Sequence, residues 1–279
     1  MKSPTGSPAQ LMRSATEVQQ FIHDHFRSHP DVICVIPVWE LENPADTVLT
    51  VFDQDILVGC IRYHFVGHCD AKRIHTVDCF CVHLDWRGKG VGDYLLHELH
   101  HMMKDDPYAI FLKEGKQLPI IPFYTGIYVY RTLGKSQDTD RVLDISTDLA
   151  YQLMEINHSF RPFFRIHTKT ANQKWRIYRE GIYHVLCCIQ DTYQTLYGKK
   201  MGWITAWIES PGMTDTMRET ASYQLSYMPY FDMIWMNQIH IINTQTWKKP
   251  LWEIDGPFYW YTYQWSPIQD VGKSYCFIH

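Results

Sequence analysis

The sequence of 279 residues predicts an α+β fold: a mixed, mostly antiparallel twisted sheet flanked by helices and built as two fused, pseudo-symmetric halves. Short β-branched and aromatic runs at 47–52, 57–66 and 74–83 are separated by turn sequences, which is typical of an antiparallel meander. After about residue 140, helix and strand patterns follow in a similar order. This order indicates a duplicated fold, although the sequence itself contains no visible repeat.

Helices are expected where apolar residues recur at helical spacing. Ser14 and Glu17 form a capping pattern in front of Val18, Phe21 and Ile22, so the first helix should begin there. Further helices are expected over 91–104, 149–157, 170–180 and 222–228. Further strands are expected over 108–113, 183–190 and 202–209, and from Met233 and Phe258 onward.

Composition limits the classes of function. The net charge of −4 lacks the basic excess of a dedicated nucleic-acid binder, so nucleic acid is not an expected partner. The sequence contains no run of about 18 apolar residues and no signal-peptide core, so we expect no membrane span and a cytoplasmic location. The eight cysteines lie mostly in apolar, strand-like runs and are expected to be reduced. Residues 1–12, rich in Ser, Pro and Gly, are expected to be flexible.

One glycine-rich turn carries a chemical signal. Residues 87–92 read RGKGVG, between a predicted strand and a predicted helix. Glycines let the backbone approach a ligand closely, and the first amides of a helix lack intrahelical partners, so this place favours a phosphate. The Walker A pattern and the dinucleotide fingerprint both fail, because Lys89 is not followed by Ser or Thr and the required third glycine is missing. A turn that only packs a strand against a helix remains the alternative.

The pattern Arg-x-x-Gly-x-Gly in this setting resembles the pyrophosphate-binding signature of the GNAT acyltransferases. The resemblance implies a GNAT-like fold and an acyl-CoA co-substrate whose diphosphate binds at the turn. The cofactor-binding residues expected from it are Val82, Arg87, Gly88, Lys89, Gly90, Val91 and Gly92.

A competing motif predicts zinc. Residues 97–101 read HELHH and match HExxH, in which two histidines on one helix face bind zinc. The apolar stripe of this helix comprises Val91, Leu95, Leu99 and Met102, which places His97 and His101 toward solvent. Cys79, Cys81 and His83 alternate along a strand, but the outer two would lie about 13 Å apart. We therefore expect no metal site.

Three blocks narrow the resemblance to glycylpeptide N-myristoyltransferase. The first is residues 77–83, VDCFCVH, which are similar to that family's strand before the turn. The second joins 118–119, LP, to 128–133, YVYRTL. The third joins Asp255-Gly256 to 261–265, YTYQW, and to an apolar end at 276–279. The blocks occur in the family's order within 47–133 and 231–279.

This resemblance implies transfer of a long acyl chain, from myristoyl-CoA, to the N-terminal glycine amine of a protein or peptide. The two backbone amides that polarise the thioester map to Cys79 and Phe80, and the catalytic base maps to the terminal carboxylate of His279. Residues 13–140 would then bind the acyl-CoA and 141–279 the acceptor. The expected substrate-binding residues are Asp78, which replaces the family's asparagine, Asp255 and Gly256.

Two departures keep other functions open. Residues 112–115, LKEG, include the positions where the family has Thr-Ala-Gly, and the turn at 87–92 is closer to the acetyltransferase pattern. One alternative is a GNAT N-acetyltransferase acting on another amine. The other is a catalytically inactive protein that binds acyl-CoA or an acylated peptide.

Overall fold

The computed structural model describes residues 2–26, 31–69, 72–133, 140–156, 172–237, 253–264 and 275–276. The helices in this part are α1 Ala15–His25, α2 Val38–Leu41, a 3-10 turn η1 Leu84–Trp86, α3 Val91–Met102, α4 Thr147–Ile156 and α5 Asp215–Leu225. The strands are β1 Gln10–Leu11, β2 Val32–Cys34, β3 Thr47–Asp53, β4 Ile56–Cys69, β5 Lys72–Val82, β6 Ala109–Glu114, β7 Tyr124–Thr132, β8 Val142–Ile145, β9 Gln173–Glu180, β10 Tyr183–Leu196, β11 Lys199–Glu209, β12 Met233–Asn237, β13 Glu253–Tyr263 and β14 Tyr275–Cys276.

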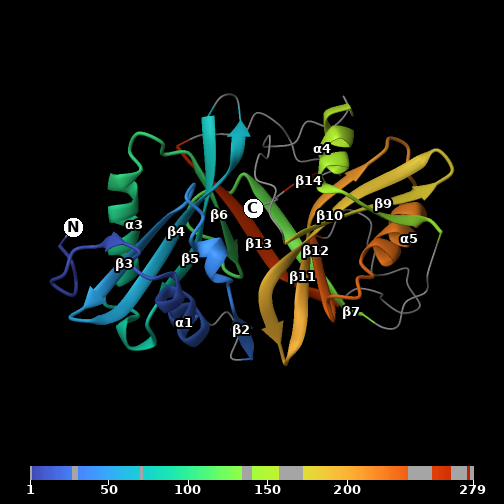
Figure 1. Ribbon diagram of the computed structural model, residues 1–279. Helices are drawn as coiled ribbons and strands as arrows, with labels where there is room; N and C mark the ends of the chain where they lie inside the picture. Colours follow the sequence, from blue (N-terminus) through green and yellow to red (C-terminus); the bar gives the residue numbers. More distant parts are fainter. Residues whose placement is uncertain are drawn as a thin grey trace.

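One mixed sheet runs through the described part of the molecule (Figure 1). Its order is β1-β3-β4-β5-β6-β13-β7-β12-β11-β10-β9-β8, with β2 paired to β10 and β14 paired to β11. Among the described strands, β5 with β6 and β11 with β12 are parallel, and the other pairs are antiparallel. The predicted fold class, mixed but mostly antiparallel and flanked by helices, is confirmed.

The two halves of the chain share strands. β13, from the last part of the chain, lies between β6 and β7 and crosses the middle of the molecule (Figure 1). β2, from the first part, pairs with β10. Each half therefore completes its sheet with a strand from the other.

Helices α1 and α3 cover the β3–β5 region on separate apolar clusters. Ser14 caps α1 as expected, because its side chain accepts a hydrogen bond from the Glu17 amide at 3.2 Å. Val91 and Leu95 of α3 pack so tightly on β4 that a Cβ at Gly59 would lie 2.8 Å from Val91 Cγ1. This close packing contact holds the first turns of α3 against the sheet.

Some sequence predictions are wrong. The expected helix over 170–180 is strand β9 where the structure describes it, since Trp175 and Ile177 alternate into the core and β8 and β10 pair on its two sides. The helix expected over 222–228 is α5, which begins at Asp215, capped by Thr214, and ends at Leu225. Met102, placed in the apolar stripe of α3, is 47% exposed because it lies in the last turn, beyond the sheet contact.

The structure also shows how three further regions or residue types compare with the sequence predictions: the N-terminal segment, the cysteines and the helices. Within residues 1–12, Gln10–Leu11 form β1 against β3. Six cysteines are buried free thiols: Cys34, Cys60, Cys79, Cys81, Cys187 and Cys188. None of the described helices has the length and apolar character needed to cross a membrane.

Candidate active site

The site is built where two parallel strands separate. β5 and β6 pair only at His75 with Ala109 and at Thr76 with Ile110. On its other edge β6 pairs with β13 along its whole length, and β5 pairs with β4 on its other edge. The two strands therefore diverge and leave an opening between Asp78–Val82 on one side and Phe111–Glu114 on the other.

β5 is bulged where it faces this opening. Cys60 pairs with Cys81 and Arg62 pairs with Asp78, so Ile61 alone lies opposite both Cys79 and Phe80. Cys79 has a φ of +48°, which is rare for a residue with a side chain. A bulge takes backbone groups out of the ladder and re-aims them. The amides of Cys79 and Phe80, singled out from the sequence, thus lie on a distorted strand beside the opening.

The cysteine at the bulge is not a nucleophile candidate. Its side chain is buried against the cluster under α1, and burial raises the pKa of the Cys79 thiol well above its usual range. A thiol attacks as the thiolate, which this environment disfavours. The chemistry available at this position therefore comes from its backbone.

The glycine-rich turn follows directly. Gly88 and Gly90 have φ values of +74° and +84°, and Gly90 is the N-cap of α3 without a side-chain cap. Positive φ explains why glycine stands at both positions. The first amides of α3 therefore face outward with the positive end of the helix dipole, beside the opening.

The side chains around the two glycines of the turn are held by different kinds of contact. The Arg87 guanidinium donates to the Val82 carbonyl at 3.3 Å and to the His25 carbonyl at 2.8 Å. Lys89 lies over the Trp86 ring, 4.9 Å from its centroid. Gly92 packs under the Phe80 ring, which a Cβ there would approach to 3.0 Å. The turn thus holds two cations near the helix terminus, one of them anchored to α1.

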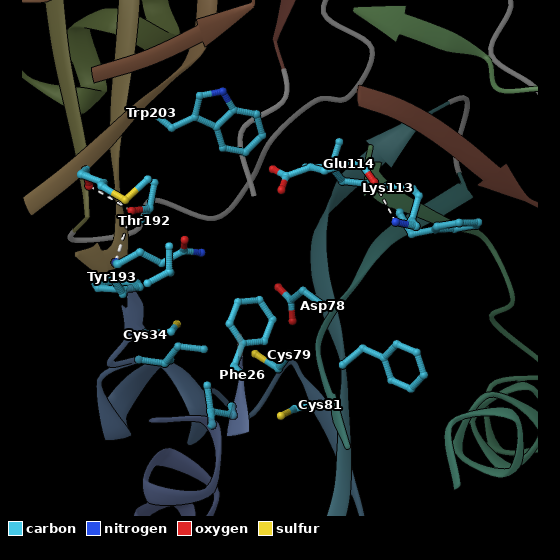
Figure 2. A pocket seen from close by; sticks show the side chains of 18 of the residues that line it. Phe26, Cys34, Asp78, Cys79, Cys81, Lys113, Glu114, Thr192, Tyr193 and Trp203 are labelled. Carbon is cyan, nitrogen blue, oxygen red and sulfur yellow. Dashed lines mark hydrogen bonds between the residues drawn. The ribbon is translucent and has the colours of Figure 1, made fainter. Parts of the chain in front are cut away.

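A cavity of about 1440 Å³ lies between the diverging strands and the second half of the chain (Figure 2). It exceeds the roughly 300–1,000 Å³ of ordinary small-molecule sites. Figure 2 shows Phe26, Cys34 and Cys79 toward one end, and Glu114 and Trp203 toward the other. The cavity therefore has an apolar end and a polar, aromatic end.

Most of the residues predicted from the sequence meet at this cavity. Those lining it are Asp78, Cys79, Phe80, Val82, Arg87, Gly88, Gly90, Gly92 and Asp255. Lys89, Val91 and Gly256 do not line it, and Val91 is buried in the packing of α3 on β4. His279 lies outside the described residues.

Asp78 belongs to a buried charge cluster that the sequence analysis missed. Arg62 holds it with two bonds, Nε to Oδ1 at 2.7 Å and Nη2 to Oδ2 at 2.8 Å. The same guanidinium lies 3.6 Å from Asp46 and 3.7 Å from Glu40. A charged residue in the apolar run 57–66 was the available signal, since such a residue needs partners when it is buried.

Asp255 lies on a second bulge, on the opposite wall. Ile254 pairs with Val129 and Gly256 with Tyr128, so Asp255 is the extra residue of β13. Its carboxylate accepts a hydrogen bond from the Trp235 indole at 2.8 Å. The bulge turns this carboxylate into the cavity, which Gly256 itself does not reach.

The zinc motif lies away from the cavity, on the far end of α3. His97 contacts Glu98 at 3.1 Å, and its ring meets the ring of the exposed His101 edge-on, with the centroids 4.7 Å apart. Within the described residues, no group of three or more His, Cys, Asp or Glu side chains is arranged to hold a metal.

The diverging strands, the bulge and the glycine-rich start of α3 all lie in one segment that is similar to a known family. Residues 12–125 match the Acetyltransferase (GNAT) family. This segment covers α1 to the start of β7 and includes the whole opening. The GNAT resemblance seen in the sequence is thereby confirmed. No curated protein sequence matches the chain.

Solved structures that align along most of this chain include N-myristoyltransferases and a tandem GNAT protein. Saccharomyces cerevisiae N-myristoyltransferase with bound myristoyl-CoA and inhibitors aligns with a TM-score of 0.64 at 12% identity, over 96% of this chain and 85% of that one. The same yeast enzyme with bound myristoyl-CoA gives a TM-score of 0.59 at 13% identity, over 100% and 93%. A tandem GNAT protein from the clavulanic acid biosynthesis pathway gives 0.54 at 12%, over 91% and 97%. At these identities the likeness shows the fold, two fused GNAT-like halves.

Proposed function

We propose that this chain is an N-acyltransferase that moves a long acyl chain, myristoyl in the first instance, from CoA to the N-terminal glycine amine of a protein or peptide. The observation that supports this proposal most strongly is the bulge of β5. It lies where β5 and β6 have separated, beside a cavity with an apolar end. In this proposal residues 13–140 bind the acyl-CoA, and 141–279 bind the acceptor.

The bulge supports direct attack on the thioester. The amides of Cys79 and Phe80 donate to the carbonyl oxygen, which becomes an oxyanion as the amine adds. Donors fixed in advance at such an oxygen are worth several kcal/mol of barrier, about 2.7–4 for one donor in a protease. Collapse of the adduct breaks the carbon–sulfur bond, and the CoA thiolate leaves and takes up one proton.

The glycine-rich turn supports binding of the CoA diphosphate. The first amides of α3, after Gly90, point away from the helix with its positive dipole end. Arg87 adds a positive charge that two carbonyls hold in place. Val82, Gly88 and Gly92 line the path between this anchor and the bulge.

The apolar end of the cavity supports a long acyl chain. Five side chains from α1, β2 and the segments that follow them line it: Ile22, Phe26, Val32, Cys34 and Ile36. Each buried methylene is worth about 0.8 kcal/mol, so a chain of many carbons gains affinity here that an acetyl group does not need.

The base in this proposal is the carboxylate of His279, with Asp255 and Gly256 beside the acceptor. β14 runs antiparallel to β11, and its end at Cys276 is directed toward the part of β11 that carries Trp203, a cavity residue. Asp255 presents a carboxylate from the opposite wall, toward a basic or amino group of the acceptor.

Labelled acyl transfer tests the proposal. The purified chain is incubated with myristoyl-CoA or acetyl-CoA and with a glycine-initiated peptide or its alanine-initiated counterpart. We expect product from myristoyl-CoA with the glycine peptide. Deletion of His279 should abolish turnover and leave CoA binding intact, and unchanged turnover would refute its role.

A second candidate is a GNAT N-acetyltransferase that acts on another amine. The match of residues 12–125 to an acetyltransferase family favours it. Product from acetyl-CoA alone would select this candidate and rule out the lipid. Binding of acyl-CoA without turnover of any amine would instead indicate an inactive acyl-CoA-binding protein.

A further inference from the structure

Glu114 ends strand β6 at the level of the β5 bulge. At about 3.3 Å per residue, Cys79 lies about 10 Å beyond the last parallel pair and Glu114 about 13 Å beyond it. The two therefore lie at nearly the same height on strands that have separated. A group between the strands at this height is within reach of both walls.

The side chain of Glu114 projects from the cavity face of the sheet. Thr76 and Ile110 are paired neighbours, and residues two apart on a strand share a face. Asp78 on β5 and Leu112 and Glu114 on β6 therefore project to the same side, and all three line the cavity. Figure 2 shows Glu114 directed into the cavity, with Trp203 on the opposite wall.

The carboxylate of Glu114 has no ion pair or hydrogen bond among the described residues, whereas the other cavity acids are held, apart from Asp93 in the first turn of α3. Asp78 is bound to Arg62, Glu253 accepts from Tyr130, and Asp255 accepts from Trp235. The ammonium of Lys113 donates to the backbone carbonyl of Glu114. Glu114 is thus left to act on something that enters the cavity.

A second polar group, close to the point where β5 and β6 separate, also lacks a hydrogen-bond partner among the described residues. The Thr76 hydroxyl is buried, with its residue only 2% exposed, and it has no hydrogen bond to any described part of the chain although it lines the cavity. A buried hydroxyl without a partner costs about 1–3 kcal/mol. An acceptor or ordered water between the strands would satisfy it, which points to a polar ligand on the same face as Glu114.

We propose that Glu114 is a second catalytic residue of the transfer, which binds the acceptor as an ammonium ion and removes the first of its two protons before attack, so that the carboxylate of His279 acts on the second. This rests on the proposed acyl transfer. The carboxylate of Glu114 takes one proton from the ammonium, the free amine adds to the thioester carbon, and the carbon–sulfur bond breaks. The carboxylate of His279 takes the second proton from the nitrogen of the adduct and passes it to the leaving CoA thiolate, and Glu114 returns its own proton to water.

The surroundings of Glu114 suit a base. Glu114 is an exposed residue at the end of β6, but the protein around it desolvates its carboxylate in part. This desolvation and the repulsion from the nearby carboxylate of Asp255 raise the pKa of Glu114, and Lys113 opposes the rise in part. Glu253 and Tyr130 face the same end of the cavity. A base works best when its pKa approaches the working pH.

The kinetic test compares Glu114→Gln with Glu17→Gln, a matched change on the exposed side of α1. With myristoyl-CoA and a glycine-initiated peptide, Glu114→Gln should lower kcat by about 10²- to 10⁴-fold and remove the acid limb of the pH profile. Asp255→Asn should shift that limb to lower pH, since the repulsion that raises the pKa is gone. Wild-type turnover and pH dependence in Glu114→Gln would overturn the proposal.

A binding test needs no turnover. The protein is saturated with a non-reactive thioether analogue of myristoyl-CoA, and the free peptide and its N-acetylated form are titrated by calorimetry. Wild type should prefer the free amine by about tenfold or more, and Glu114→Gln should lose that preference. An equal preference in both proteins would overturn the proposal. If wild type binds the thioester but turns over no amine, the acyl-transfer proposal fails, and this comparison alone judges Glu114.

Discussion

Replacing Arg62 by methionine should destabilise the fold more than replacing its partner Asp78 by asparagine. The Arg62 side chain is 9% exposed and faces three carboxylates within 4 Å, those of Asp78, Asp46 and Glu40. Its removal leaves these charges without their shared cation, which costs about 3–5 kcal/mol in buried pairs. Asp78→Asn keeps the guanidinium beside Asp46 and Glu40, so the loss should be nearer one charge-assisted bond, about 1.5–3 kcal/mol.

Urea unfolding of the two single variants and the double variant measures this order. The double variant should be more stable than the sum of the single losses predicts, since Asp78→Asn removes one of the stranded charges. Equal losses in the single variants, or a loss under about 1 kcal/mol for Arg62→Met, would refute the reasoning.

Three further predictions concern the turn, the apolar end and the core. Gly90→Ala should cost about 1–2 kcal/mol, because φ is +84° there, and should weaken CoA binding in calorimetry more than Lys89→Ala does. Cys34→Trp should fill the apolar end and shift the kcat/KM optimum in an acyl-CoA series toward shorter chains; an unchanged optimum would place the acyl chain elsewhere. Burial lowers the pKa of His75 from 6.5 to about 4, so the unfolded chain binds more protons in that window and stability falls as the pH drops through it. His75→Gln should flatten that slope in urea unfolding across pH.

Local signals in the sequence predicted much of the first half. The cap at Ser14, the meander and the helix after the glycine-rich turn were all predicted near their observed places. β9 was not, because its charged residues, Lys174, Arg176 and Arg179, differ from the β-branched and aromatic residues by which the other strands were predicted. Pairing with β8 and β10 decides that segment, and such pairing is not local information.

In the candidate site too, the contiguous motifs were predicted, whereas the residues brought together by strand pairing were not. The turn at 87–92 and the strand before it were predicted because their motif is contiguous. The bulge at Cys79 carries no glycine to mark its positive φ. Arg62, Asp46 and Glu40 meet only through strand pairing and the position of α2, and Glu114 acquires its place because β6 separates from β5 while it stays paired with β13. These residues are far apart in the sequence, so no local sequence motif could predict their contacts.

The position of β13 has a consequence for how the molecule forms. β6, which carries Glu114, has only two residue pairs with β5 and takes most of its ladder from β13, a strand made about 140 residues later. Until those residues leave the ribosome, β6 presents unpaired amides and carbonyls, a template for aggregation. The cavity should therefore form late in synthesis. Fragments that stop before residue 253 should be prone to aggregation as well as inactive.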